Sequence, residues 1–164
     1  MKSDPCPPLP AVRQILAFVL IFLITWCAPL TGFFGMPGEW YAALEKPSWN
    51  PPSWIFGPVW SLLYTLMAVA AWLVWRKGGW PARRKELSWY GVQLLLNAAW
   101  TPLFFGLHRP DLALVDIVLL NLAVALTLAA FFSINRTAGW LMIPYQLWLL
   151  FAAILNATLW WMNR

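Results

Sequence analysis

Indole and phenol side chains are the groups in this sequence best able to do chemistry. Trp60 and Tyr64 lie four residues apart in one apolar stretch, and Tyr145 and Trp148 lie three apart in another. Residues with this spacing share one face of a helix, so each pair can present two flat, electron-rich rings to a common cavity. Aromatic side chains also fill ordinary cores. For Trp60 and Trp148, a pocket role and a packing role both stay open.

Polar side chains show the same spacing of three or four residues. Asn97 and Thr101 share a helical face with Phe104, and Ala152 and Asn156 continue the face that carries Trp148. An amide inside a membrane helix needs a partner, so Asn97 and Asn156 either bond to neighbouring helices or contact a ligand.

Two further ionisable residues have more than one interpretation. Asp116 would be costly in lipid, so we expect it to face the bundle, a neighbouring chain or a water-accessible end. His108 precedes Arg109 and Pro110 at a predicted helix end, which favours an interfacial residue over a haem or metal ligand.

Other kinds of chemistry lack their usual residues. The sequence has no metal-ligand cluster, nucleophile triad, phosphate loop or pair of carboxylates, so it indicates neither hydrolysis nor phosphoryl transfer nor metal catalysis. Cys6 and Cys27 have neither metal-site nor disulfide-framework spacing. We therefore expect no metal and no required cofactor.

The elements that position these residues are membrane spans. Sixty-two per cent of the residues are hydrophobic and 10% are charged, against about 45–50% and about 25% in soluble domains. A spanning helix needs about 20 apolar residues. Five stretches qualify, which predicts an all-α, polytopic five-transmembrane-helix bundle in a single domain over 1–164. The predicted spans are about 12–34, 53–75, 87–107, 112–134 and 138–162.

Basic residues predict the orientation of this integral membrane protein. With five spans, eight of the eleven lysines and arginines lie on the side of the N-terminus. Because basic loops stay inside, we expect the N-terminus inside if the protein is in a bacterial inner membrane. Arg83-Arg84-Lys85 is then a membrane anchor rather than a nucleic-acid patch, and no nucleic-acid partner is expected.

The first loop, 35–52, is predicted to be a lid on the outer side. Pro47, Pro51 and Pro52 fix the backbone and remove donors, which favours a stiff, extended connector rather than a helix. The connector presents large rings at fixed positions, so it can cover a cavity.

These residues together resemble the TspO/MBR family, the tryptophan-rich sensory proteins and mitochondrial translocator proteins. The resemblance covers residues 12 to 163, and no single motif is specific without the others. The matching motifs are Trp40-Tyr41, Leu44, Lys46-Pro47, Trp49, Pro51-Pro52, Val59-Trp60, Leu63-Tyr64, Leu96-Asn97, Trp100, Phe104-Phe105-Gly106, Ala113-Leu114, Pro144-Tyr145, Trp148, Phe151-Ala152 and Leu155-Asn156.

The resemblance implies a five-helix bundle, commonly a homodimer, and a receptor that binds tetrapyrroles such as protoporphyrin IX. It also implies light-dependent porphyrin degradation, in which Trp60 and Trp148 match the two reactive tryptophans. A carrier of porphyrin or another amphipathic ligand is the alternative function. The ligand-binding residues transferred from the family are Trp40, Tyr41, Pro51, Trp60, Tyr64, Asn97, Thr101, Phe104, Trp148 and Ala152.

Three features leave parts of the resemblance open. Thr101 stands where other members can carry Asn, which leaves the fine ligand preference undecided. The segment Leu155 to Arg164 lacks the tyrosine that the proposed sterol motif requires, so a cholesterol site is not expected. The sequence does not distinguish an inner from an outer bacterial membrane.

Overall fold

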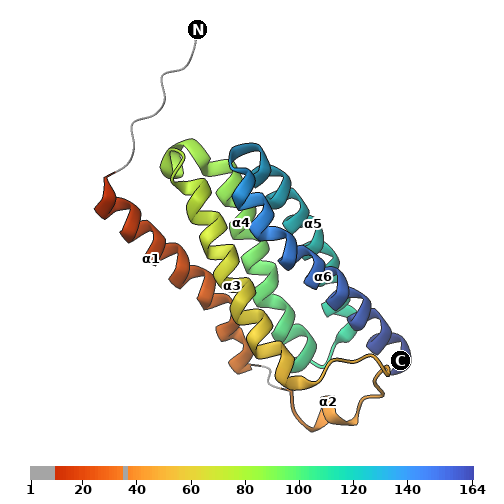
Figure 1. Ribbon diagram of the computed structural model, residues 1–164. Helices are drawn as coiled ribbons and strands as arrows, with labels where there is room; N and C mark the ends of the chain where they lie inside the picture. The colour runs from red at the N-terminus through yellow and green to blue at the C-terminus, as the bar shows by residue number, and fades with distance from the viewer. Residues whose placement is uncertain (1–9, 35–36) are drawn as a thin grey trace.

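The computed structural model describes residues 10–34 and 37–164, and every regular element within these ranges is helical. The long helices lie side by side along one axis (Figure 1). The elements are α1 (Ala11–Cys27), the 3₁₀-helix η1 (Ala28–Phe34), α2 (Glu39–Ala43), α3 (Ser53–Trp75), α4 (Gly79–Thr101), the π-helix η2 (Pro102–Gly106), α5 (Pro110–Ile134) and α6 (Arg136–Met162).

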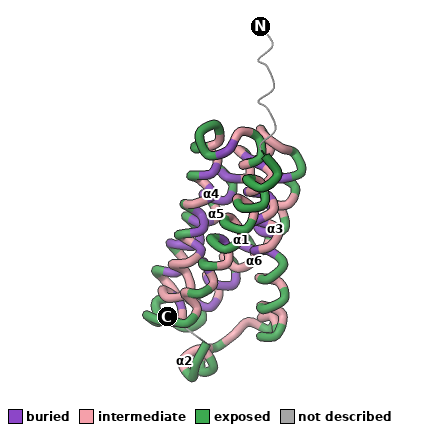
Figure 2. The backbone as a smooth tube through the Cα atoms, turned by 90° about the vertical axis from the view of Figure 1, so that its left-hand side faces the viewer, coloured by how far each residue is buried: buried purple, intermediate pink, exposed green. Residues whose placement is uncertain are grey.

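Helices α3 to α6 form the packed body of the bundle. α5 packs against α4 and α6, α3 packs against α6, and α1 contacts the body through α3. Ala68, Ala70 and Ala71 on α3 are fully buried. Small side chains of this kind let membrane helices approach closely. Figure 2 shows the result: buried residues follow the inner helices, whereas most of α1 is exposed.

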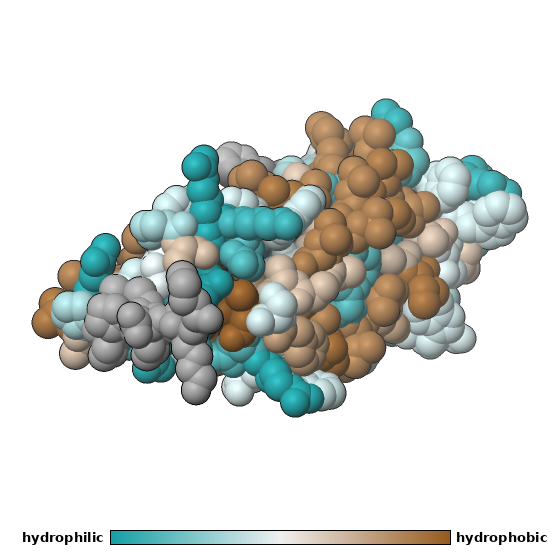
Figure 3. All heavy atoms as spheres, turned by 90° about the horizontal axis from the view of Figure 1, so that it is seen from above, coloured by the Kyte–Doolittle hydropathy of each residue, from teal (hydrophilic) through white to brown (hydrophobic). Residues whose placement is uncertain are grey.

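The exposed surface is apolar, as a lipid environment requires. Large hydrophobic side chains are exposed along α1, α5 and α6, and Figure 3 shows a continuous apolar stretch on one face, bordered by hydrophilic side chains. By length and composition, four segments can cross a membrane: Ala11–Phe33, Ser53–Trp75, Pro110–Ile134 and Arg136–Met162. The protein is thus a polytopic helical membrane protein.

The predicted third span differs most from the structure. We expected it over 87–107, but α4 begins at Gly79, kinks at Arg83 (φ −123°, ψ 23°) and gives way to η2 at Pro102. α4 is not among the four segments that qualify as spans. Its first turns carry Arg83, Arg84, Lys85 and Glu86. The count of five spans therefore stays a prediction.

The lid contains a helix that the sequence did not predict. α2 covers Glu39–Ala43, so the expectation of an extended connector is wrong for this part. Proline constrains itself and the residue before it, and the first proline after α2 is Pro47. Leu44 (φ −64°, ψ 141°) is extended, but the Asn50 N–H donates to the Pro47 carbonyl at 2.9 Å and closes a turn, so the connector is extended only in part. Residues 35 and 36 of the predicted lid lie outside the described residues.

Candidate ligand pocket

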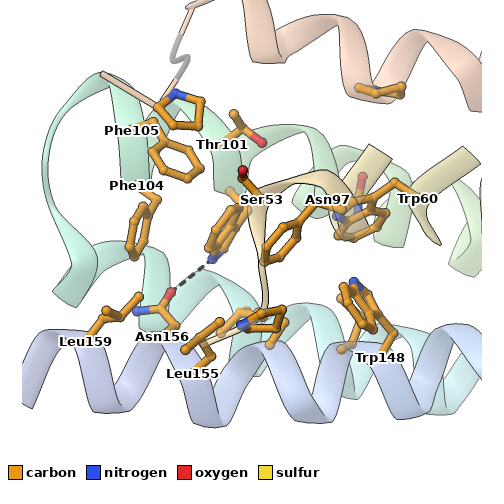
Figure 4. A pocket seen from close by; sticks show the side chains of 18 of the residues that line it. Ser53, Trp60, Asn97, Thr101, Phe104, Phe105, Trp148, Leu155, Asn156 and Leu159 are labelled. Carbon is orange, nitrogen blue, oxygen red and sulfur yellow. Dashed lines mark hydrogen bonds between the residues drawn. The ribbon is translucent and has the colours of Figure 1, made fainter. Parts of the chain in front are cut away.

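A cavity of about 440 Å³ lies inside the bundle at the lid end. Its walls come from α3, α4, η2, α5 and α6 (Figure 4). Tyr41, Asn50 and Pro51 of the lid also line it. The volume falls within the range of about 300–1,000 Å³ found for small-molecule sites. The lining residues are Pro29, Pro37, Tyr41, Asn50, Pro51, Ser53, Phe56, Gly57, Trp60, Tyr64, Asn97, Trp100, Thr101, Phe104, Phe105, Ile117, Leu120, Trp148, Leu149, Ala152, Leu155, Asn156 and Leu159.

Aromatic rings held by other rings form much of the wall. Trp60 stacks on Tyr64 with centroids 5.4 Å apart and meets the ring of Tyr145 edge-on at 6.2 Å. Trp148 contacts Phe56 at 5.9 Å and Phe151 at 5.4 Å. Trp60 and Trp148 come from different helices and both border the cavity (Figure 4). Because each indole is braced by neighbours, the wall presents flat surfaces in fixed orientations.

Asn97 joins three helices at the base of this wall. The Tyr64 hydroxyl donates to Asn97 Oδ1 at 2.7 Å, and Asn97 Nδ2 donates to the Tyr145 hydroxyl at 3.0 Å. Tyr145 in turn donates to Gln93 Oε1 at 3.1 Å. Of the two roles considered for Asn97, the structure shows the interhelical one, at a position that also borders the cavity.

Asn156 also joins neighbouring helices by hydrogen bonds, at the lid end of the cavity. Trp100 Nε1 donates to Asn156 Oδ1 at 3.0 Å, the dashed line in Figure 4, and Asn156 Nδ2 donates to the carbonyl of Pro110 at 2.8 Å. Trp100 also stacks on Phe104 with centroids 5.0 Å apart. α4, η2, α5 and α6 are thereby tied together around the cavity mouth.

The lid is held by ring contacts from below. Tyr41 meets Phe105 edge-on at 5.2 Å, and Lys46 Nζ lies 4.8 Å from the centroid of the Tyr41 ring. Burial raises the pKa of the Tyr41 phenol above its ordinary value. A phenol is neutral at physiological pH, and the raised pKa keeps Tyr41 in this form.

A polar latch fastens the lid to the end of α6. The Glu45 backbone N–H donates to Asn163 Oδ1 at 2.9 Å, and Asn163 Nδ2 donates to the Glu45 carbonyl at 3.0 Å. A third bond, from Asn163 Nδ2 to the Leu159 carbonyl at 2.8 Å, fixes the amide on α6.

Removing this latch should loosen the lid. We expect Asn163→Ala to speed amide hydrogen exchange in the lid peptide around Glu45 about tenfold, because each lost bond contributes roughly 0.5–1.5 kcal/mol. Arg164→Ala is the matched control, since Arg164 packs on Trp161 rather than on the lid. Equal exchange in the Asn163 variant and the native chain would show that ring contacts alone hold the lid.

The structure brings most of the predicted binding residues to one place. Nine of the ten border the cavity, and Trp40 does not. The Trp40 indole instead stacks on His108 at 4.5 Å and meets the edge of Phe104 at 5.7 Å, so it braces the wall from behind. His108 is exposed, at φ +54°. The binding role of these residues stays a prediction.

The cavity is also lined by residues that the sequence did not predict as binding residues. Trp100, Asn156, Phe56 and Phe105 line the cavity although they were absent from the expected binding set. Trp100 and Asn156 already followed the three-and-four spacing, which was the available signal. Asp116 is 7% exposed and faces the bundle interior, but it does not border the cavity, and its Oδ2 has no partner among the described residues.

An aromatic cavity enclosed by apolar helices beneath a loop lid defines a polytopic membrane protein with an internal cavity of ligand size. The chain belongs to the TspO/MBR family, whose model matches residues 17–162. It is 39% identical over 150 residues to the protein CrtK of Rhodobacter capsulatus, covering 89% of this chain and 92% of that one. It is 44% identical over 124 residues to the human translocator protein, covering 74% and 73%. It is 43% identical over 141 residues to a tryptophan-rich sensory protein of Cereibacter sphaeroides, covering 85% and 87%.

Proposed function

We propose that the protein is a membrane receptor or sensor that binds a tetrapyrrole, such as protoporphyrin IX, in this cavity. The observation that carries the proposal is the wall of braced indole and phenol rings from α3 and α6 around one enclosed space. A flat macrocycle gains offset-stacked and edge contacts with such rings beyond the area that it buries. The names of the relatives, sensory and translocator protein, support a ligand-responsive role.

Polar atoms at the rim add to the proposed recognition. Asn50, Ser53 and Thr101 border the cavity near the lid, while most of the lining is apolar. A porphyrin that carries carboxylates on one edge could place its apolar body among the rings and its carboxylates at this rim. Sites of this kind use a few polar groups to fix orientation.

A porphyrin titration tests the proposal. Protoporphyrin IX should shift its absorption on binding and quench tryptophan fluorescence, and Trp60→Phe/Trp148→Phe should weaken the affinity about tenfold, because two ring contacts of roughly 1 kcal/mol each are reduced. Trp140→Phe/Trp161→Phe is the matched control, since these indoles are 61% and 62% exposed. Affinity should be read from the porphyrin absorption, which does not depend on the number of tryptophans. Unchanged affinity in the Trp60/Trp148 variant would reject this pocket.

We also propose that bound porphyrin is degraded in light at the same wall. Both candidate reactive indoles, Trp60 and Trp148, border the cavity. An excited porphyrin forms oxidants with oxygen, and electron-rich indoles held against the macrocycle can form radicals that direct its breakdown. The measurement is product formed per protein molecule under light. A defined product formed repeatedly supports an enzyme, whereas protein bleaching in step with porphyrin loss shows stoichiometric damage.

A further inference from the structure

A second, smaller cavity of about 180 Å³ lies at the end of the bundle opposite the lid. It is lined by Leu73, Arg76 and Lys77 at the end of α3 and in the following turn, and by Asn135 between α5 and α6. Two interhelical connections thus meet at this point, as Figure 1 shows for the ends of these helices. The lining contains two cations and one amide, with no acidic side chain.

The end of α3 and the turn after it bring Arg76 and Lys77 to the cavity. The Arg76 and Lys77 N–H groups donate to the carbonyls of Trp72 and Val74, which completes the last turn of α3. The Arg76 guanidinium carbon lies 4.6 Å from the centroid of the Trp72 ring, so this cation is held on an indole face. Gly78 then turns the chain at φ +127°, and a Cβ there would lie 2.7 Å from the Ala82 Cβ. The turn therefore requires glycine, and the backbone of the two basic residues before it is fixed, although both side chains are exposed.

The charges at this cavity have no counter-ion among the described residues. The one ion pair among the residues that the structure describes joins Arg109 to Asp111, near the lid end. Asn135 Oδ1 accepts from the Ala138 N–H at 3.2 Å as the N-cap of α6. Its Nδ2 donor remains available at the cavity, and the helix N-terminus adds partial positive charge there. Two cations, an amide donor and a helix N-terminus together favour an anion with several acceptor oxygens.

We propose that this cavity binds the phosphate group of an anionic phospholipid, such as phosphatidylglycerol. The cavity lies where the bundle's basic residues collect, the side predicted to be inside, and anionic lipids attract basic residues at that leaflet. Leu73, which is partly buried against the core, is the apolar side chain of the lining. The volume is less than half that of the main cavity. It holds a headgroup rather than a macrocycle, so the site is independent of the proposed porphyrin function.

Lipid titrations followed by native mass spectrometry of the full chain test this site. We expect phosphatidylglycerol to bind about tenfold more tightly than zwitterionic phosphatidylcholine, and Arg76→Gln/Lys77→Gln to remove that preference. Arg84→Gln/Lys85→Gln is the matched control, because it removes the same charge from exposed residues outside the cavity. The control should keep the preference to within about twofold. An equal loss in both variants would show diffuse attraction to the basic end and would overturn the proposal.

A second variant keeps the test decisive if the double substitution disturbs the fold. Asn135→Asp preserves the oxygen that caps α6 but replaces the amide donor with a negative charge facing the cavity. We expect it to weaken phosphatidylglycerol binding at least fivefold, on the order of one lost charge-assisted contact, with unchanged helix content. Undiminished binding in this variant would overturn the proposal. Displacement of the lipid by millimolar inorganic phosphate would assign the site to free phosphate and would overturn the lipid assignment.

Discussion

Ala152→Trp is expected to lower protoporphyrin IX affinity about a hundredfold, which corresponds to about 2.7 kcal/mol. Ala152 borders the cavity one turn after Trp148 on the same face of α6. An indole at this position would occupy part of the cavity, which Asn97, Thr101 and Phe104 border from α4 and η2. The porphyrin would then have to displace side chains that are already packed, and overpacking of this kind is costly.

The same substitution should leave the fold intact, because it fills a cavity instead of crowding a packed core. Helix content and melting temperature, measured beside porphyrin affinity, separate blocked binding from misfolding. Ile154→Trp is the matched control: it adds an indole two residues further on, at a side chain that is 62% exposed. Full porphyrin affinity in Ala152→Trp would place the ligand elsewhere and contradict the proposed function.

The sequence predicted the helices best where an apolar run and a helix end together. The expected span 53–75 coincides with α3, because prolines precede it and charged residues follow it. It predicted α4 poorly, since the first turns of that helix are charged and extend it beyond its apolar part. It missed α2 because the prolines of the lid determine only their own neighbourhood, and Glu39–Ala43 lies before them.

The site could be anticipated to the extent that it depends on helical periodicity. Trp60 and Tyr64, four residues apart, stack on each other and border one cavity, as the spacing indicated. Contacts between residues on different helices could not be predicted from helical spacing. Trp100 and Asn156 are 56 residues apart and meet only because α4 and α6 both pack against α5. Trp40 is next to Tyr41 in sequence, yet only Tyr41 borders the cavity, because adjacent helical residues point in different directions.

Asn97→Leu is expected to destabilise the protein by about 1–3 kcal/mol, because buried hydroxyl groups then lose their partners. Its side-chain amide uses both ends: Oδ1 accepts from Tyr64 and Nδ2 donates to Tyr145. Leucine has similar size and no polar atom, so the Tyr64 hydroxyl loses the acceptor that it has among the described residues, within a buried site. The melting temperature of the detergent-purified protein should fall by about 4–8 °C.

Gln93→Leu is the comparison for Asn97→Leu. Asn97 lies in the middle of the chain of hydrogen bonds, whereas Gln93 lies at its end. Gln93 only accepts from Tyr145, and its Nε2 is buried without a partner in the described part of the chain. Leucine leaves the Tyr145 hydroxyl proton without its acceptor, but it also removes the unsatisfied Nε2 donor, which offsets that cost, and Tyr145 still accepts from Asn97. We expect a change of less than about 1 kcal/mol. Equal destabilisation by the two substitutions would mean that side-chain volume, rather than the amide that joins α3, α4 and α6, holds the base of the pocket together.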